Sequence, residues 1–242
     1  RALAPGQLSY RQMTEMYRYT DISKSTTIYG VVADPVGHSL SPVVHNAAFQ
    51  DSGLDMVYIP FRVPLDELGS FLGDCPDLGI KGLSVTIPHK EEIMQFLDQV
   101  DTDAATIGAC NTAVFDGQQI AGYNTDHQAA VDSLLRAHAK SGPTPLKGKT
   151  SLILGAGGAA KSVAYGLTQL GSDVVITSRN DERTNALAER FSCRTVPWEE
   201  RQKIRAGILI NTTPIGMHPK VDESPYEKRH IDRGMVVFDT VY

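Results

Sequence analysis

The chain has 242 residues, of which 41% are hydrophobic and 21% charged, and its formal net charge is −5 at pH 7. This length favours two domains, and the small negative charge excludes the basic surface that holds nucleic acid. No apolar run approaches the roughly 20 residues of a membrane-spanning helix, and the N-terminus has no signal-peptide core. We therefore expect a cytoplasmic protein that acts on small molecules.

The first half of the chain reads as α/β structure after a polar start. Residues 1–25 contain one weakly helical stretch, 10–17, with too little apolar surface to fold alone. Short apolar runs then alternate with helical patterns, which is typical of parallel βαβ units. We expect strands at 29–32, 57–61 and 82–87 and a helix that begins at Pro42, is N-capped by Ser41 and closes at Gly53.

A hairpin and a long helix lead toward the second half. Asp116-Gly117 suits a type I′ turn and predicts a hairpin between 113–115 and 119–121. A helix is expected at 125–139, and residues 141–145 contain glycine and prolines that prevent its continuation. A domain boundary is therefore predicted there.

A glycine-rich turn follows the boundary. Residues 150–154 form an apolar strand that runs into Gly155-Ala156-Gly157-Gly158-Ala159-Ala160 and then a helical pattern ending at Gly171. In this GxGxx(G/A) pattern Gly155 permits the tight turn and Gly157 lets backbone N–H groups approach a pyrophosphate. A second strand at 173–177 lies at the expected distance, which favours a dinucleotide site over a simple βα turn.

The residues after that second strand indicate which dinucleotide binds. NAD-binding proteins place an acidic side chain there, whereas this chain has Ser178-Arg179-Asn180. Arg179 offers a 2′-phosphate a bidentate cationic partner, so NADP is favoured. The alternative is that Arg179 and Arg183 are solvated surface charges.

Two stretches of the first half carry candidate substrate groups. Ser39 and Ser41 flank a helix N-terminus, whose free N–H groups suit a carboxylate, although Ser41 would equally serve as a plain helix cap. In Ser84–Lys90 a strand ends at a proline-initiated helix with Lys90 in its first turn, where the helix dipole disfavours the ammonium form and so assists proton transfer. Asp126, at the start of the 125–139 helix, is available to orient Lys90.

The remaining reactive side chains indicate neither disulfides nor a metal. Cys75, Cys110 and Cys193 fit no metal spacing and are expected to be reduced packing residues. The histidines near these motifs are His38, His45, His89 and His127. No two of them have the i, i+4 spacing of a metal-binding helix.

Six ordered motifs together resemble shikimate dehydrogenases. They are SLSP at 39–42, SVTIPHK at 84–90, GACNT at 108–112, GYNTD at 122–126, GAGGAA at 155–160 and NTTPIGM at 211–217. The resemblance implies reversible NADPH-dependent reduction of 3-dehydroshikimate to shikimate in aromatic amino acid biosynthesis. It also implies an α/β fold, with an open α/β substrate domain at 26–128, a connecting helix and linker at 129–146, and a Rossmann-type NADP-binding domain at 147–242.

The resemblance also implies roles for individual residues. Ser39 and Ser41 would hold the substrate carboxylate, Thr86, Asn111 and Asp126 its ring hydroxyls, and Lys90 would form the catalytic pair with Asp126. Tyr242 is a further expected substrate contact. The expected cofactor contacts are Gly155, Ala156, Gly157, Gly158, Ala159, Ser178, Arg179, Asn180, Arg183, Thr212 and Met217.

Several features depart from the family pattern. Ser178-Arg179-Asn180 replaces the common Asn-Arg-Thr, Ala129 replaces a frequent glycine, and the chain stops at Tyr242, where the family continues into helices that include a substrate-binding glutamine. At the other end, residues 4–7 resemble the tail of a type I 3-dehydroquinate dehydratase. This implies derivation from a bifunctional fusion, with 1–25 as the tail of an upstream dehydratase-like domain.

Two other functions share these motifs. A quinate/shikimate dehydrogenase of relaxed specificity often prefers NAD, which Ser178-Arg179 argues against. A non-catalytic homologue that binds the cofactor or a metabolite would not need Lys90 and Asp126.

Overall fold

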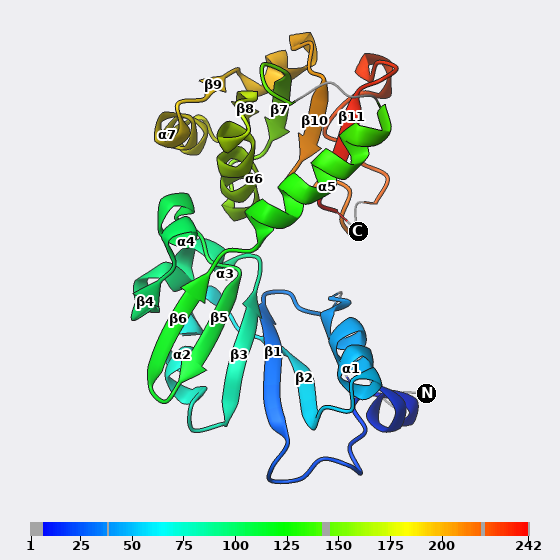
Figure 1. The fold of residues 1–242 in the computed structure, drawn as a ribbon, viewed down its shortest axis with the longest axis vertical. Coiled ribbons are helices and arrows are strands. Elements are labelled where there is room, and N and C mark those ends of the chain that lie inside the picture. The colour runs from blue at the N-terminus through cyan, green and yellow to red at the C-terminus, as the bar shows by residue number, and fades with distance from the viewer. Residues whose placement is uncertain (1–6, 38, 142–145, 219–220, 242) are drawn as a thin grey trace. The chain divides into compact units, whose positions relative to one another are not determined.

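The structure, a computed structural model, describes residues 7–37, 39–141, 146–218 and 221–241. His38, Tyr242, most of the dehydratase-like motif and the predicted break at 142–145 lie outside this range. The chain divides into two compact units, residues 1–124 and 125–242 (Figure 1). In the described residues no helix is long and apolar enough to cross a membrane.

The first unit contains a six-stranded mixed sheet with the order β2-β1-β3-β5-β6-β4. β1 runs parallel to β2 and β3, and β5 is antiparallel to β3 and β6. The three strands predicted first in the chain are confirmed as β1, β2 and β3. The strands are β1 (Thr27–Ala33), β2 (Met56–Arg62), β3 (Ile80–Val85), β4 (Gln99–Val100), β5 (Thr112–Asp116) and β6 (Gln119–Tyr123).

The predicted hairpin forms, but its turn differs from the prediction. Asp116 pairs with Gln119, so Gly117 and Gln118 form the two-residue loop. Gly117 has a φ of 59°, whereas Gln118 is not among the residues with positive φ. A type I′ turn needs positive φ at both central residues, so the prediction of Asp116-Gly117 in a type I′ turn is wrong; glycine at the first central position is typical of type II′.

Helices of the first unit cover both faces of this sheet. Because side chains alternate along a strand, Tyr29 of β1 contacts Phe49 of α1 while Val32 packs in a core that includes Leu68 and Leu72 of α2. α1 and α2 therefore lie on opposite faces. The helices are α1 (Ser41–Asp51), α2 (Leu68–Asp74), α3 (His89–Glu92), α4 (Thr102–Ile107), and the short turns η2 (Leu65–Glu67) and η3 (Ile93–Phe96).

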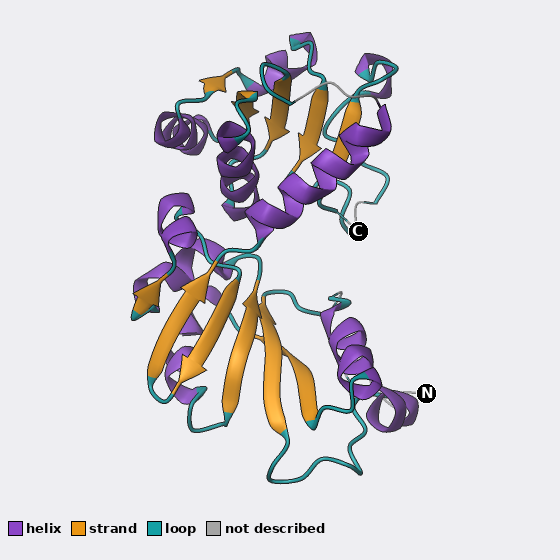
Figure 2. Ribbon diagram, viewed as in Figure 1, coloured by secondary structure: helices purple, strands orange, loops and turns teal. Residues whose placement is uncertain are grey.

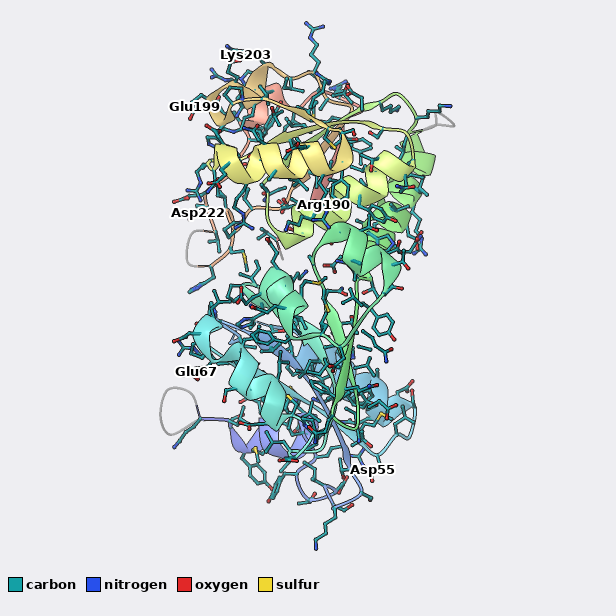
Figure 3. All side chains as sticks on the ribbon, turned by 90° about the vertical axis from the view of Figure 1, so that its left-hand side faces the viewer. Asp55, Glu67, Arg190, Glu199, Lys203 and Asp222 are labelled. Carbon is teal, nitrogen blue, oxygen red and sulfur yellow. The ribbon has the colours of Figure 1, made fainter. Side chains whose placement is uncertain are left out.

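The described part of the N-terminal segment packs on the first unit. The weakly helical stretch contains a π-helical turn, η1 (Gln12–Met16), and Gln50 of α1 donates a hydrogen bond of 3.0 Å to the carbonyl of Glu15. Further along, the carboxylate of Asp55, labelled in Figure 3, accepts hydrogen bonds from the hydroxyls of Ser25 and Thr26. These polar contacts compensate for the small apolar surface of the segment.

The second unit contains a five-stranded parallel sheet with the order β11-β10-β7-β8-β9. The two strands predicted at 150–154 and 173–177 are confirmed as β7 and β8. Strand order reverses between β7 and β10, the position where open α/β sheets bind ligands. The strands are β7 (Thr150–Leu154), β8 (Asp173–Thr177), β9 (Arg194–Thr195), β10 (Ile208–Asn211) and β11 (Val236–Asp239).

Both faces of this sheet are buried, as parallel sheets require. Ile153 packs in a core with residues of three helices, while Leu152 and Leu154 face a second cluster that includes Tyr226. Helix α5 packs on α6 and β11, so the helix interpreted from sequence as a connector belongs to the second unit (Figure 2). The helices are α5 (Asp126–Ser141), α6 (Gly158–Gln169), α7 (Asp181–Phe191), η4 (Trp198–Lys203) and η5 (Lys228–His230).

Candidate active site

Three of the predicted substrate residues meet at one end of the first unit's sheet. Thr86 and Lys90 follow the carboxyl end of β3, and Asn111 precedes β5, which runs the opposite way. Two backbone hydrogen bonds join these segments: Val85 N–H donates to the carbonyl of Asn111 at 2.7 Å, and Cys110 N–H donates to that of Lys90 at 2.8 Å. This is the end of an α/β sheet at which ligands bind.

The helix that carries Lys90 is shorter than predicted. α3 has four residues, His89–Glu92, and continues as the 3₁₀ turn η3. A helix of one turn has too few aligned peptide groups for a substantial dipole, so the predicted dipole effect on Lys90 loses its basis. Lys90 is half-buried at the sheet end. The structural support for a role of Lys90 is its position near Thr86 and Asn111.

His89 anchors the segment before Lys90. Its side chain is fully buried, and its Nε2–H donates a 2.9 Å hydrogen bond to the carbonyl of Val63, just beyond β2. Burial lowers the pKa of His89, against the opposing effect of the Val63 carbonyl and the charges of Asp34 and Glu92. Nδ1 is buried without a hydrogen-bond partner in the described residues. A neutral ring that donates from Nε2 fits both observations.

The helix at Ser41 begins differently from the prediction. Ser41 is the first residue of α1, Leu40 occupies the N-cap position with helical dihedrals, and there is no side-chain cap. The prediction that Ser41 is the N-cap is therefore wrong. Instead the hydroxyl of Ser39 accepts a hydrogen bond of 3.3 Å from the Ser41 N–H. Capping does not occupy the Ser41 hydroxyl.

Tyr58 lies beside these serines and was not predicted. Its hydroxyl donates a hydrogen bond of 2.6 Å to Ser84, and its ring stacks on His45 with centroids 4.2 Å apart. Burial raises the pKa of Tyr58, while hydrogen bonds with the Ser84 and Ser41 hydroxyls oppose the rise. Tyr58 thus links Ser41, at the start of α1, with Ser84 of β3. No local pattern signals this role, because three elements distant in sequence create it.

Asn46 fastens the start of α1 to β2. Its side-chain amide donates to the carbonyls of Pro42 at 2.8 Å and Tyr58 at 2.9 Å, and its Oδ1 accepts from the Tyr58 N–H at 2.9 Å. Asn46 is buried, and both its amide nitrogen and its Oδ1 have hydrogen-bond partners. These bonds fix the position of the first turn of α1 along β2. The same bonds fix Tyr58.

Asp126 belongs to the second unit, where it is the first residue of α5. Two residues earlier, the side chain of Asn124 is buried and donates a hydrogen bond of 2.8 Å to the carbonyl of Ala109. This anchor ties the end of β6 to the segment that leads into Asn111. Asn124 is thus fixed at the sheet end where Asn111 lies, and Asp126 follows it by two residues.

In the second unit, the glycine turn has the geometry predicted for it. Gly155 has a φ of 116°, and a Cβ there would lie 2.5 Å from the hydroxyl oxygen of Thr212. The Thr212 hydroxyl in turn donates a 2.7 Å hydrogen bond to the carbonyl of Leu154, which ties β10 to β7. Only glycine fits at position 155.

Gly157 differs from Gly155 in a way that points to a ligand. Its backbone is extended, with a φ of −94°, and a Cβ there would meet no atom within 4 Å. The protein fold itself therefore does not require glycine at this position. Gly157 leaves room in front of the N-terminus of α6, where backbone N–H groups bind a pyrophosphate. The residues present thus fit a dinucleotide.

The side chains after β8 occupy distinct environments. Ser178 is 9% exposed and hydrogen-bonds Thr184 and the backbone of Asn180, so its hydroxyl faces inward. Asn180 caps α7 by accepting from the Arg183 N–H at 2.9 Å. Arg179 and Arg183 are exposed. Position 178 therefore presents no carboxylate to a ribose and no negative charge to a 2′-phosphate.

The loop after β10 is organised by Asn211. Its amide donates to Asp239 at 3.0 Å, and its Oδ1 accepts from the N–H and hydroxyl of Thr213. Met217 follows on this loop and is 40% exposed. An apolar side chain held near the strand-order reversal suits a nicotinamide ring.

Cys75 and Cys193 contribute nothing to these sites, whereas Cys110 directly precedes Asn111. Cys75 and Cys110 are buried and Cys193 is half-buried. Burial raises the pKa of Cys75 to about 12 and that of Cys193 to about 11. All three pack in or against the apolar cores, as predicted, and their reduced state stays a prediction.

Two family models match the chain, one in each of its two units. Residues 31–113 match the family described as shikimate dehydrogenase substrate binding domain, and residues 151–241 match that described as NADP oxidoreductase coenzyme F420-dependent. These matches define an NADP-dependent oxidoreductase.

Individual relatives show the family. The chain is 39% identical to the NADP(+) shikimate dehydrogenase of Methanothermobacter thermautotrophicus, over 91% of this chain and 80% of that one. A solved shikimate dehydrogenase in complex with NADP+ has a TM-score of 0.81 and 37% identity, covering 91% of this chain and 78% of that one. A bifunctional 3-dehydroquinate dehydratase/shikimate dehydrogenase of Arabidopsis thaliana is 38% identical, over 99% of this chain and 42% of that one. The chain belongs to the shikimate dehydrogenase family.

Proposed function

We propose that the chain catalyses the reversible NADPH-dependent reduction of 3-dehydroshikimate to shikimate in aromatic amino acid biosynthesis. The observation that carries the proposal is the convergence of Thr86, Lys90 and Asn111 at one sheet end, where backbone hydrogen bonds hold their segments together. A ketone to be reduced needs a proton donor and hydroxyl-binding groups, and these residue types supply both.

In the reduction, Lys90 donates a proton to the carbonyl oxygen and stabilises the negative charge that develops on it. Bound NADPH supplies the hydride that the carbonyl carbon accepts, so the C=O group becomes a CH–OH group. Asp126 orients Lys90 and balances its charge. In the reverse direction Lys90 accepts the hydroxyl proton.

The other residues bind and orient the substrate. Ser39 and Ser41 hold its carboxylate at the start of α1, where the nearby helix N–H groups favour an anion. Thr86 and Asn111, with Asp126, hold the ring hydroxyls. The position of Ser41 beside Tyr58 supports this assignment, because it keeps the serine at a fixed place on the sheet.

The cofactor is held by the residues of the second unit. The turn from Gly155 to Ala159 binds the pyrophosphate through backbone N–H groups. Arg179 binds the 2′-phosphate, with Asn180 and Arg183 at the start of α7 beside it, while Met217 lines the nicotinamide pocket. The glycine at position 157, which the fold itself does not require, supports this assignment.

We also infer that the chain derives from a bifunctional dehydratase–dehydrogenase. The similarity of 99% of this chain to part of a plant bifunctional enzyme supports this inference. Sequencing the coding region upstream of residue 1 tests it, because a fusion requires an in-frame dehydratase. The wide spacing of the three cysteines in the sequence, which suggests no disulfide framework, favours a reducing compartment such as the cytoplasm.

A turnover assay tests the activity. Purified protein is incubated with shikimate or quinate and with NADP or NAD, and the reduced cofactor is followed by absorbance. We expect turnover with shikimate and NADP. Equal rates with quinate would show a relaxed quinate/shikimate dehydrogenase, and calorimetric binding of both ligands without turnover would show a non-catalytic homologue.

A further inference from the structure

Three residues separate β8 from α7, and they include the arginine proposed to read the 2′-phosphate. Arg179 is exposed, and in the described residues its side chain makes no ion pair or hydrogen bond. The flanking backbone therefore sets the position and direction of its Cα–Cβ bond, from which the guanidinium reaches out. The two flanking residues, Ser178 and Asn180, hold that backbone.

The backbone of Asn180 is held by two hydroxyl groups. Ser178 and Thr184 are 9% and 3% exposed, and their hydroxyl oxygens lie 2.7 Å apart. The Asn180 N–H donates to Ser178 at 3.1 Å, and the Thr184 hydroxyl donates to the Asn180 carbonyl at 2.9 Å. With the Ser178 hydroxyl donating to Thr184, these bonds form a closed ring in which both hydroxyl protons are used.

This ring fixes the backbone on both sides of Arg179. Ser178 directly follows Thr177, the last residue of β8. The carbonyl of Thr177 accepts a hydrogen bond of 2.8 Å from the Gly155 N–H. The backbone around Arg179 and the glycine turn are thus both hydrogen-bonded to the carboxyl end of β8. A loop backbone that is already held in its bound conformation loses less entropy on binding.

We infer that Ser178 and Thr184 are positioning residues for cofactor selectivity, whose hydroxyl pair fixes the backbone from which Arg179 reaches the 2′-phosphate. Ser178 thereby acts behind the cofactor site and not as one of its contacts. The inference rests on the proposed phosphate-binding role of Arg179. It adds Thr184, a residue of α7 outside every motif, to the residues that select NADP.

Calorimetric dissociation constants for NADP and NAD test the inference with the complete chain. Thr184→Val removes the hydroxyl and keeps the shape, and we expect it to weaken NADP binding about three- to tenfold and to leave NAD binding unchanged. Thr184→Ser restores the hydroxyl and should recover the NADP affinity. Ser151→Ala is the matched control, because the buried Ser151 forms another hydroxyl pair with the half-buried Ser172, with a 2.7 Å separation.

The outcomes separate the positioning role from its alternatives. Equal weakening of NADP and NAD by Thr184→Val, or a change in their ratio with Ser151→Ala, would overturn the inference. In an Arg179→Ala background Thr184→Val should leave the NADP-to-NAD ratio unchanged. Arg179→Ala with full NADP preference would refute the phosphate role itself, whereas loss of preference in Arg179→Ala but not in Thr184→Val would refute only the positioning role.

Discussion

The cofactor-binding turn of the second unit and the substrate end of the first unit are built in different ways. In the turn, the critical groups are backbone atoms of consecutive residues, and Gly155 and Gly157 shape them directly. At the substrate end, side chains from α1, β2, β3 and the loop before β5 meet through long-range hydrogen bonds such as that from Tyr58 to Ser84. A backbone site is therefore encoded locally, whereas a side-chain site depends on how distant elements pack.

The largest effect is expected at the substrate end, where one side chain performs the proton transfer. Lys90→Ala should lower kcat by about 10²- to 10⁴-fold and change the KM for shikimate much less, because its interaction is strongest with the alkoxide-like transition state. Steady-state kinetics with NADP measure both constants. Lys81→Ala, at an exposed lysine of β3, should leave both unchanged. A Lys90 variant with near-normal kcat would remove this lysine from the mechanism.

In the second unit, Arg179→Ala should raise the dissociation constant for NADP roughly ten- to a hundredfold and leave that for NAD nearly unchanged. A charge-assisted hydrogen bond to the 2′-phosphate accounts for this range, and the nearby Asp181 and Glu182 favour its lower end. Calorimetry measures both affinities. Arg205→Ala, at an exposed arginine before the amino end of β10, is the control. Equal losses with both cofactors would mean that Arg179 stacks on the adenine or supports the fold.

The same contrast explains what the sequence could predict. Strands β7 and β8 match their predicted bounds, because apolar runs and glycines mark them locally. The inward direction of Ser178 did not follow from the sequence, since it depends on Thr184, six residues further on in the first turn of α7.

At the substrate end, the residue types were recognised but their local geometry was not. Ser41 is not the cap, because the helix already begins at Ser41 and Leu40 occupies the N-cap position, and α3 is a single turn. Tyr58 and Asn46 were missed altogether, because an aromatic residue in a strand and an amide in a helix have no pattern that distinguishes them from packing residues.

Two glycine variants sharpen the claim that the cofactor site is a backbone site. Gly155→Ala should destabilise the fold by about 1–3 kcal/mol, because alanine is strained at a φ of 116° and its Cβ would approach Thr212 too closely. Gly157→Ala should leave the melting temperature nearly unchanged but weaken NADP binding about tenfold, since the added methyl group occupies ligand space. Thermal unfolding and calorimetry distinguish the two variants. Similar melting losses for both would show that position 157 is also structural.

The smallest effect tests whether distant packing controls the substrate end. Tyr58→Phe keeps the ring on His45 but removes the hydroxyl that links Ser84 with Ser41. The loss of one such hydrogen bond is worth about 0.5–1.5 kcal/mol, so the KM for shikimate should rise about two- to tenfold while kcat stays within about twofold. Tyr29→Phe is the matched control, because the Tyr29 hydroxyl makes no hydrogen bond in the described residues and its ring also packs on α1.

Ser41→Ala separates the binding role of this cluster from a purely structural one. Because Ser41 does not cap α1, its loss should raise the KM for shikimate without lowering the melting temperature appreciably. If Tyr58 acts by positioning Ser41, then Tyr58→Phe in the Ser41→Ala background should raise the KM by less than it does alone. Fully additive changes in the double variant would show that Tyr58 and Ser41 act independently, and a Tyr58 variant with a lower melting temperature but an unchanged KM would show that its hydroxyl only supports the fold.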